Sequence, residues 1–181
     1  MFKYFKKLQL PGFLCILCIL GAAVPAQYPQ QAVKEVPMRI ESSAFKDGEP
    51  IPKKYTCSGI NVSPQLSIHD VPSDVRSFAL IMEDPDAPKG TFDHWIAWNF
   101  SKNTRQISEG AHPPREGRNG YGEGRYHGPC PPFGENHRYY FKLYALDREL
   151  ALPSGSSKEQ LQEAMEGHIL EQAELVGTFA K

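Results

Sequence analysis

The sequence lacks internal repeats, low-complexity tracts and runs of like charge. Its 20 basic and 21 acidic residues nearly cancel, which leaves a formal net charge of −1. Proteins that bind nucleic acids rely on basic patches to neutralise phosphates. We therefore expect no nucleic-acid partner for this chain.

An apolar stretch long enough to span a membrane is also missing. The run from Phe13 to Val24 has about 12 residues, whereas a membrane-spanning helix needs about 20. Lysines precede this run and small residues ending at Ala26 follow it, as in a secretory signal peptide. We expect residues 1–26 to be a cleaved signal peptide, 27–37 a flexible leader and 38–181 one folded domain. The protein would then be periplasmic or secreted, without stable membrane insertion; an uncleaved N-terminal anchor is the alternative.

Cysteine is scarce beyond the predicted signal peptide. Only Cys57 and Cys130 remain, and they predict either one disulfide in an oxidising compartment or two buried free thiols. After Ala26 the chain has no C-x-x-C pair, and it has no H-E-x-x-H motif. We expect no metal ion and no cofactor.

The 16 prolines and 15 glycines favour short strands and turns over long helices. Residues 101–133 show little periodicity and predict a long loop. The pattern of residues 156–167 predicts the one clear helix, with Ser156 or Ser157 as its N-cap and Gly167 at its end. A mainly β fold follows, an antiparallel β-sandwich with one or two peripheral helices. Its strand patterns cover residues 38–45, 53–57, 66–68, 75–83, 95–100, 139–146 and 169–179.

The first candidate segment for chemistry, residues 84–88, reads Asp-Pro-Asp-Ala-Pro. Asp84 and Asp86 follow an apolar strand, and a hairpin would bring His94, at the start of the next strand, back toward Asp84. The two carboxylates could act as an acid–base or metal-binding pair. Alternatively, they are ordinary turn residues, because Asp and Pro initiate turns.

The second candidate segment, residues 128–132, reads Gly-Pro-Cys-Pro-Pro and precedes His137 and Tyr139. His137 begins its strand as His94 begins the preceding one, so the two imidazoles could line one cavity; each could equally be a satisfied structural residue. Glycines such as Gly128 let backbone amides approach a ligand. Nucleophile-elbow, P-loop and dinucleotide-binding motifs are all absent.

Taken together and in this order, these motifs resemble the phosphatidylethanolamine-binding protein family, also called Raf-kinase-inhibitor-like proteins, and most closely its bacterial branch. The resemblance covers about residues 38–179 and implies an antiparallel β-sandwich whose pocket accepts phosphate or a phosphorylated head group. Members are binding or inhibitory modules rather than established enzymes. Carried over by position, the pocket residues are Asp84, Asp86, His94, Gly128, His137 and Tyr139.

We therefore expect an exported module that binds a small anion and has no catalytic residue. Because protonated His94 and His137 would attract the anion, its binding should weaken as pH rises past about 7. One alternative is a metal-dependent hydrolase that uses Asp84, Asp86, His94 and His137. The other is an inhibitor of a protein partner, a protease or a kinase, that acts through the surface loop 101–125.

Overall fold

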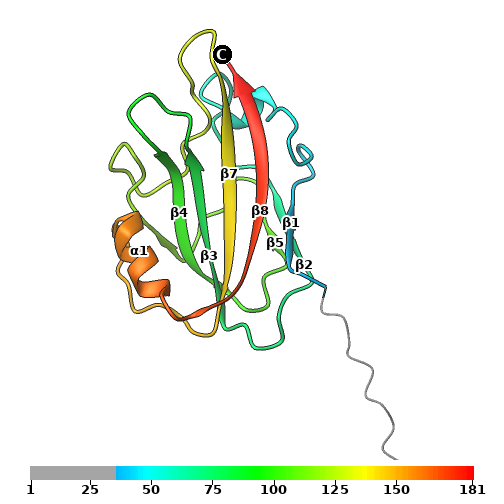
Figure 1. Ribbon diagram of the computed structural model, residues 1–181, viewed down its shortest axis with the longest axis vertical. Helices are drawn as coiled ribbons and strands as arrows, with labels where there is room; N and C mark the ends of the chain where they lie inside the picture. Colours follow the sequence, from blue (N-terminus) through cyan, green and yellow to red (C-terminus); the bar gives the residue numbers. More distant parts are fainter. Residues whose placement is uncertain (1–35) are drawn as a thin grey trace, which may run out of the picture. The chain divides into compact units, whose positions relative to one another are not determined.

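The computed structural model describes residues 36–181 and consists mainly of antiparallel β-strands (Figure 1). The predicted signal peptide and most of the predicted leader lie outside these residues. No helix among residues 36–181 is long and apolar enough to cross a membrane. The elements are β1 (Arg39–Glu41), the 3₁₀ helix η1 (Lys53–Tyr55), β2 (Leu66–His69), β3 (Ser77–Asp84), β4 (Phe92–Ser101), β5 (Gln106–Ile107), β6 (Arg115–Glu116), β7 (Asn136–Leu146), α1 (Lys158–Met165) and β8 (Ile169–Ala180).

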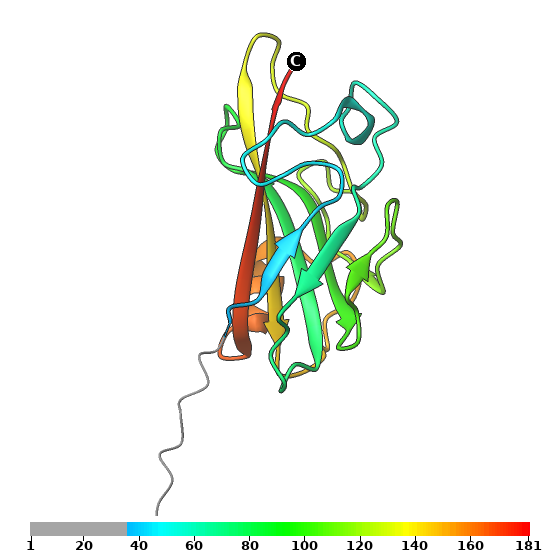
Figure 2. The ribbon, with the colours of Figure 1, turned by 90° about the vertical axis from the view of Figure 1, so that its right-hand side faces the viewer.

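The strands form two sheets, as the sequence predicts for a sandwich. The large sheet has the order β6-β4-β3-β7-β8, and the small sheet has the order β1-β2-β5. Figure 2 shows the small sheet in front of the large one, and α1 lies behind. The expected antiparallel β-sandwich with a peripheral helix is confirmed.

The central strand β3 is buried on both of its faces, which explains its continuous apolar sequence. Phe78, Leu80 and Met82 point into the main core between the two sheets. Ala79 and Ile81 point to the opposite face, where they pack with side chains of α1. A half-exposed strand would instead alternate apolar and polar residues.

Helix α1 begins with a complete capping box. The Ser157 hydroxyl accepts from the Gln160 backbone N–H, and the Gln160 side chain accepts from the Ser157 N–H. Leu161 and Met165 form its buried face. The chain leaves the helix through Gly167, whose φ of +75° lies in the left-handed region that favours glycine.

Two sequence predictions of local structure are wrong. Residues 53–57 do not form a strand, because Lys53–Tyr55 is a 3₁₀ helix that begins after Pro52. Residues 101–133 are not structureless, since β5 pairs with β2 and β6 pairs with β4. Both strands have only two residues, too few to produce a detectable alternation in the sequence.

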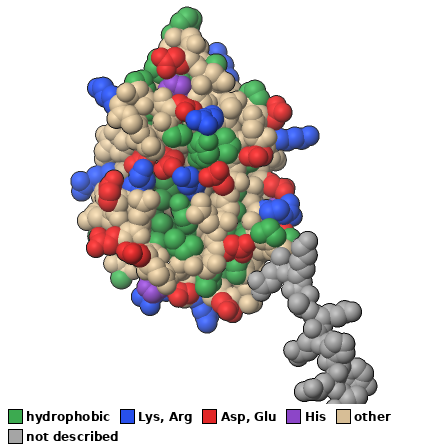
Figure 3. Space-filling model, viewed as in Figure 1, with side chains coloured by type: hydrophobic (Ala, Val, Ile, Leu, Met, Phe, Trp, Pro, Cys, Tyr) green, Lys and Arg blue, Asp and Glu red, His purple; other side chains and the backbone are tan. Residues whose placement is uncertain are grey.

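The face of the large sheet seen in Figure 3 carries charges of both signs. Lysine and arginine side chains are mixed with aspartate and glutamate there, and they do not gather into a basic patch. Part of this mixture is an ion-pair network in which Glu83 binds Lys142 and Lys158, and Lys158 also binds Asp93. The network ties α1 to β3, β4 and β7.

Candidate anion-binding site

A hollow of about 300 Å³ lies at the end of the large sheet where β3, β4 and β7 carry Asp84, His94 and His137. The β3–β4 hairpin and the loop before β7 surround it, at the same end as the C-terminus (Figure 1). The predicted return of His94 toward Asp84 is therefore present. The other walls are largely apolar: Ala87, Pro88, Phe92, Tyr121, Cys130, Pro131 and Pro132.

Asp84 and His137 form a buried pair at the base of this hollow. The His137 Nδ1–H donates to one Asp84 carboxylate oxygen over 2.7 Å, and both residues are 3% exposed. The other Asp84 oxygen accepts the Asp86 backbone N–H at 2.9 Å. Both carboxylate oxygens therefore have a donor, which is what a buried charge requires.

The second nitrogen of His137 binds a carboxylate that the sequence analysis missed. Its Nε2–H donates to the exposed side chain of Glu135 over 3.0 Å. Burial alone would lower the pKa of His137, but the hydrogen bonds to Glu135 and Asp84 prevail and raise it above its usual value. The local sequence offers only proximity as a signal, because Glu135 lies two positions before His137 and outside β7, which begins at Asn136.

His94 has the opposite electrostatic character. Its Nδ1–H donates to the His127 carbonyl over 2.7 Å, and its ring packs edge-on against Phe92 and Tyr139. Burial lowers the pKa of His94 to about 4, although the His127 carbonyl favours the charged form. The expectation of two protonated imidazoles therefore fails for His94, which is neutral at pH 7, while the pKa of His137 moves in the expected direction.

Asp86 points away from the hollow, contrary to its predicted place beside Asp84. Its carboxylate accepts three hydrogen bonds from Arg138, one from the backbone N–H and two from the guanidinium, at 2.7–2.9 Å. The arginine hydrogen bonds lower the pKa of Asp86 to about 2. This fork pairs the β3–β4 hairpin with β7 and leaves Asp84 as the carboxylate that lines the hollow.

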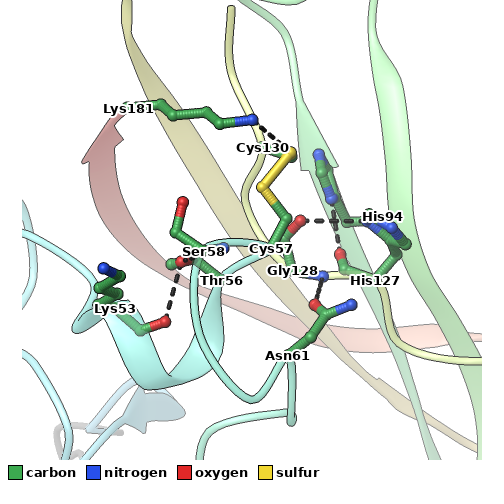
Figure 4. The surroundings of a disulfide bond; sticks show 10 residues. All are labelled: Lys53, Thr56, Cys57, Ser58, Asn61, His94, His127, Gly128, Cys130 and Lys181. Atoms are coloured by element: carbon green, nitrogen blue, oxygen red, sulfur yellow. Dashed lines mark hydrogen bonds between the residues drawn. A yellow bond between two sulfur atoms is a disulfide. The ribbon is translucent and has the colours of Figure 1, made fainter. Parts of the chain in front are cut away.

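Gly128 and Tyr139, both predicted site residues, are not among the residues that line the hollow. The Gly128 N–H donates to the Asn61 side chain at 2.7 Å, so this amide is not free to bind a ligand (Figure 4). A Cβ at position 128 would lie 2.2 Å from the Tyr55 carbonyl oxygen, which explains why the loop needs glycine. Tyr139 is fully buried and packs edge-on against the His94 ring. Its hydroxyl has no hydrogen-bond partner among residues 36–181.

Cys57 and Cys130 are joined in a disulfide (Figure 4). Of the two arrangements that the sequence left open, the structure therefore contains the bridge. Cys130 lines the hollow, and Cys57 follows η1, so the bond fastens the loop before β7 to the segment 53–61. The Cys57 N–H also donates to the Pro129 carbonyl at 3.1 Å.

A metal centre finds no support in the geometry of residues 36–181. No three side chains of His, Cys, Asp or Glu in this part of the chain are placed to hold a metal ion. Asp84 and His137 are hydrogen-bonded to each other, and Asp86 is hydrogen-bonded to Arg138. The hydrolase alternative would need these groups to rearrange.

Known proteins share both the sequence and the fold of this chain. The model of the phosphatidylethanolamine-binding protein family matches residues 41–180. A UPF0098 protein of Pyrococcus horikoshii is 42% identical over 97% of this chain and 90% of its own length. One of Chlamydia muridarum is 51% identical over 78% of this chain and 98% of its own.

Two crystal structures resemble the structure of this chain. A phosphatidylethanolamine-binding protein homologue of Chlamydia trachomatis is 48% identical, with a TM-score of 0.77 over 80% of this chain and 98% of that one. Escherichia coli YbcL, described as a member of the mammalian family of these proteins, is 27% identical, with a TM-score of 0.75 over 81% and 99%.

Proposed function

Because this chain belongs to the phosphatidylethanolamine-binding protein family, we propose that its hollow binds a small anion that carries a phosphate group. The observation that carries the proposal is the buried imidazole of His137, whose hydrogen bonds to two carboxylates favour its charged form and which lines the hollow. A cation fixed in a partly dry cavity attracts an anion far more strongly than the same cation in water.

The anion would bind by replacing Glu135. Asp84 is buried and holds the Nδ1 side of the His137 ring, whereas Glu135 is exposed and can turn into solvent. An oxyanion that enters the hollow would then accept the Nε2–H in place of the Glu135 carboxylate. The exchange keeps the imidazolium paired throughout, so no buried charge is left unsatisfied.

The proposed role is regulatory or inhibitory binding, without turnover. The side chains that line the hollow include no serine, threonine or lysine, and the sulfur of Cys130 is held in a disulfide. Covalent catalysis needs a nucleophile next to a base. His94 and His137 could act as bases, but the one hydroxyl among the lining side chains is the phenol of Tyr121, and the lining holds no aliphatic hydroxyl or free thiol for them to activate.

Calorimetric titration of the full chain with inorganic phosphate tests this function. We expect saturable binding of one phosphate per chain near pH 6, weakened at least about tenfold in His137→Gln because a charge-assisted hydrogen bond is lost. His168→Gln is the matched control, since His168 contacts Asp147 outside the hollow and its loss should leave binding unchanged. Absence of saturable binding in the parent protein would refute the proposal.

We also propose that the protein is exported, to the periplasm or beyond the cell. The N-terminal pattern of residues 1–26 supports export, and so does the disulfide, because disulfides persist mainly in oxidising compartments. Fractionation of cells that express the full chain, with N-terminal sequencing of the recovered protein, tests this. An exported protein that begins at about residue 27 is expected; an intact N-terminus on cytoplasmic protein would contradict it.

A further inference from the structure

The hollow presents one hydrogen-bond acceptor that the proposed binding of an anion does not explain. His94 lines the hollow and is 4% exposed. Its Nδ1–H is committed to the His127 carbonyl, whereas its Nε2 makes no hydrogen bond within residues 36–181. In a neutral imidazole with the hydrogen on Nδ1, Nε2 carries a lone pair and can only accept.

The surroundings of His94 keep this lone pair free of a proton. Phe92 and Tyr139 cover the ring at centroid distances of 5.0 and 5.2 Å, and the His127 ring lies at 6.4 Å. Burial of the ring and the side chain of His127 oppose the charged form, whereas the backbone carbonyls of His127 and Gly128 and the carboxylate of Asp84 favour it. Burial is the largest of these effects and lowers the pKa to about 4.

The two imidazoles of the hollow are therefore chemically unlike. His137 is a donor whose outward N–H is covered only by the movable Glu135. His94 is an acceptor. A bare oxyanion would satisfy His137 but would place an oxygen lone pair against the His94 lone pair. An oxyanion that retains a hydroxyl group would satisfy both, by accepting from His137 and donating to His94.

We infer that His94 is a specificity-determining residue that restricts the hollow to oxyanions carrying a proton. The ligand class is inorganic phosphate or a phosphate monoester. Sulfate at neutral pH and the phosphodiester group of an intact phospholipid have no proton to donate, and the hollow discriminates against both. This inference rests on the proposed function, since it concerns the chemistry of the same site.

The experiment is a calorimetric series on the full chain at pH 6.0 with four probes. Inorganic phosphate and O-phosphoethanolamine can carry a P–OH group, whereas sulfate and glycerophosphoethanolamine cannot. Sites built around a hydroxyl reject analogues that lack it, so we expect the first two to bind at least about 100-fold more tightly than the last two. The diester probe also separates a lipid head group from a free phosphate monoester as the source of the ligand.

A second arm varies the pH from 5.5 to 8.0. The second pKa of a phosphate monoester is about 6, so O-phosphoethanolamine loses its last proton across this range, whereas inorganic phosphate keeps one. The affinity for O-phosphoethanolamine relative to inorganic phosphate should therefore fall as pH rises. Deprotonation of His137 affects both ligands alike, so it cancels in this ratio.

His94→Gln provides the matched variant, because a glutamine amide can turn its donor toward the ligand. We expect the preference for phosphate over sulfate to shrink to within about tenfold, whereas His168→Gln should retain the full preference. If His94→Gln does not fold, the inference is still tested by the four-probe series and the pH series on the wild type, and by the tautomer of His94, which its ¹⁵N chemical shifts report. Equal binding of all four probes, or a proton on Nε2 at pH 7, overturns the inference but not the proposed function. Binding of none overturns both.

Discussion

The buried His137 imidazole donates its Nδ1–H to the Asp84 carboxylate, 53 positions earlier in the chain, over 2.7 Å. The contact crosses from the end of β3 to the start of β7, which pair along seven register positions. The sheet thus fixes the ring of His137 with its other nitrogen facing outward, toward Glu135. This pair is the structural basis of the proposed binding of anions.

Removal of the Asp84 charge should lower the pKa of His137. In Asp84→Asn the hydrogen-bonded and coulombic support of the imidazolium by Asp84 is lost, while the burial that opposes the charge remains. Measured by NMR titration of the ring, the His137 pKa should drop by at least about one unit, which corresponds to about 1.4 kcal/mol. An unchanged His137 pKa would show that the pair does not control the charge of the ring.

Acid should destabilise the fold through His94. Its pKa is about 4 in the folded protein and about 6.5 in an unfolded chain, so the unfolded state binds more protons between these values. As pH falls from about 6.5 to 4, His94 should therefore contribute a loss of about 3 kcal/mol in unfolding free energy. Urea denaturation of the wild type and His94→Gln across this range measures it. As the pH falls, the unfolding free energy of the variant should decrease less than that of the wild type. The same pH dependence of the unfolding free energy in both proteins would disprove the low pKa of His94.

Removal of the Glu135 carboxylate should tighten the binding of phosphate. Glu135 competes with the ligand for the His137 Nε2–H, so Glu135→Gln at pH 6 should lower the Kd by about tenfold, the value of one charge-assisted hydrogen bond. Glu123→Gln removes the same charge from an exposed pair with Arg125 and serves as control. Weaker binding in Glu135→Gln would mean that Glu135 assists the ligand instead of competing with it.

The loop that holds Cys130 should depend on the absence of a side chain at Gly128. In Gly128→Ala the new methyl would meet the Tyr55 carbonyl and the Asn61 side chain at 2.2 and 2.7 Å. Overpacking of this kind costs about 1–3 kcal/mol of unfolding free energy, measurable by denaturation. Gly124→Ala is the matched control, because its new Cβ meets nothing closer than 3.9 Å. Equal stability of the two variants would contradict the packing account.

The long strands and the proximity of Asp84 and His94 could be predicted from the sequence because both depend on local patterns. An apolar run defines β3, an aromatic run defines β4, and a proline-rich hairpin joins them. Alternation along residues 139–146 likewise corresponds to β7, with Phe141 and Leu143 in the main core and Tyr144 and Leu146 in the other. These signals extend over neighbouring residues.

The side chains whose position or charge the sequence does not predict depend instead on partners that are distant in the chain. Asp86 is drawn out of the site by Arg138, 52 residues later, and no local pattern reports that pairing. The neutrality of His94 arises from burial beside Phe92 and Tyr139, which only the folded structure provides. The hydrogen bond from His94 to the His127 carbonyl cannot be predicted from the sequence either, because any residue at position 127 has a backbone carbonyl.

The most direct test of anion binding in the hollow is to monitor the histidine side chains of the full chain by NMR while inorganic phosphate is added at pH 6. We predict saturable shifts of the His137 and His94 ring signals with one common Kd, and no shift for His168, which lies outside the hollow. Signals of His137 and His94 that stay unchanged, or that move no more than those of His168, would contradict the assignment of this hollow as the anion-binding site.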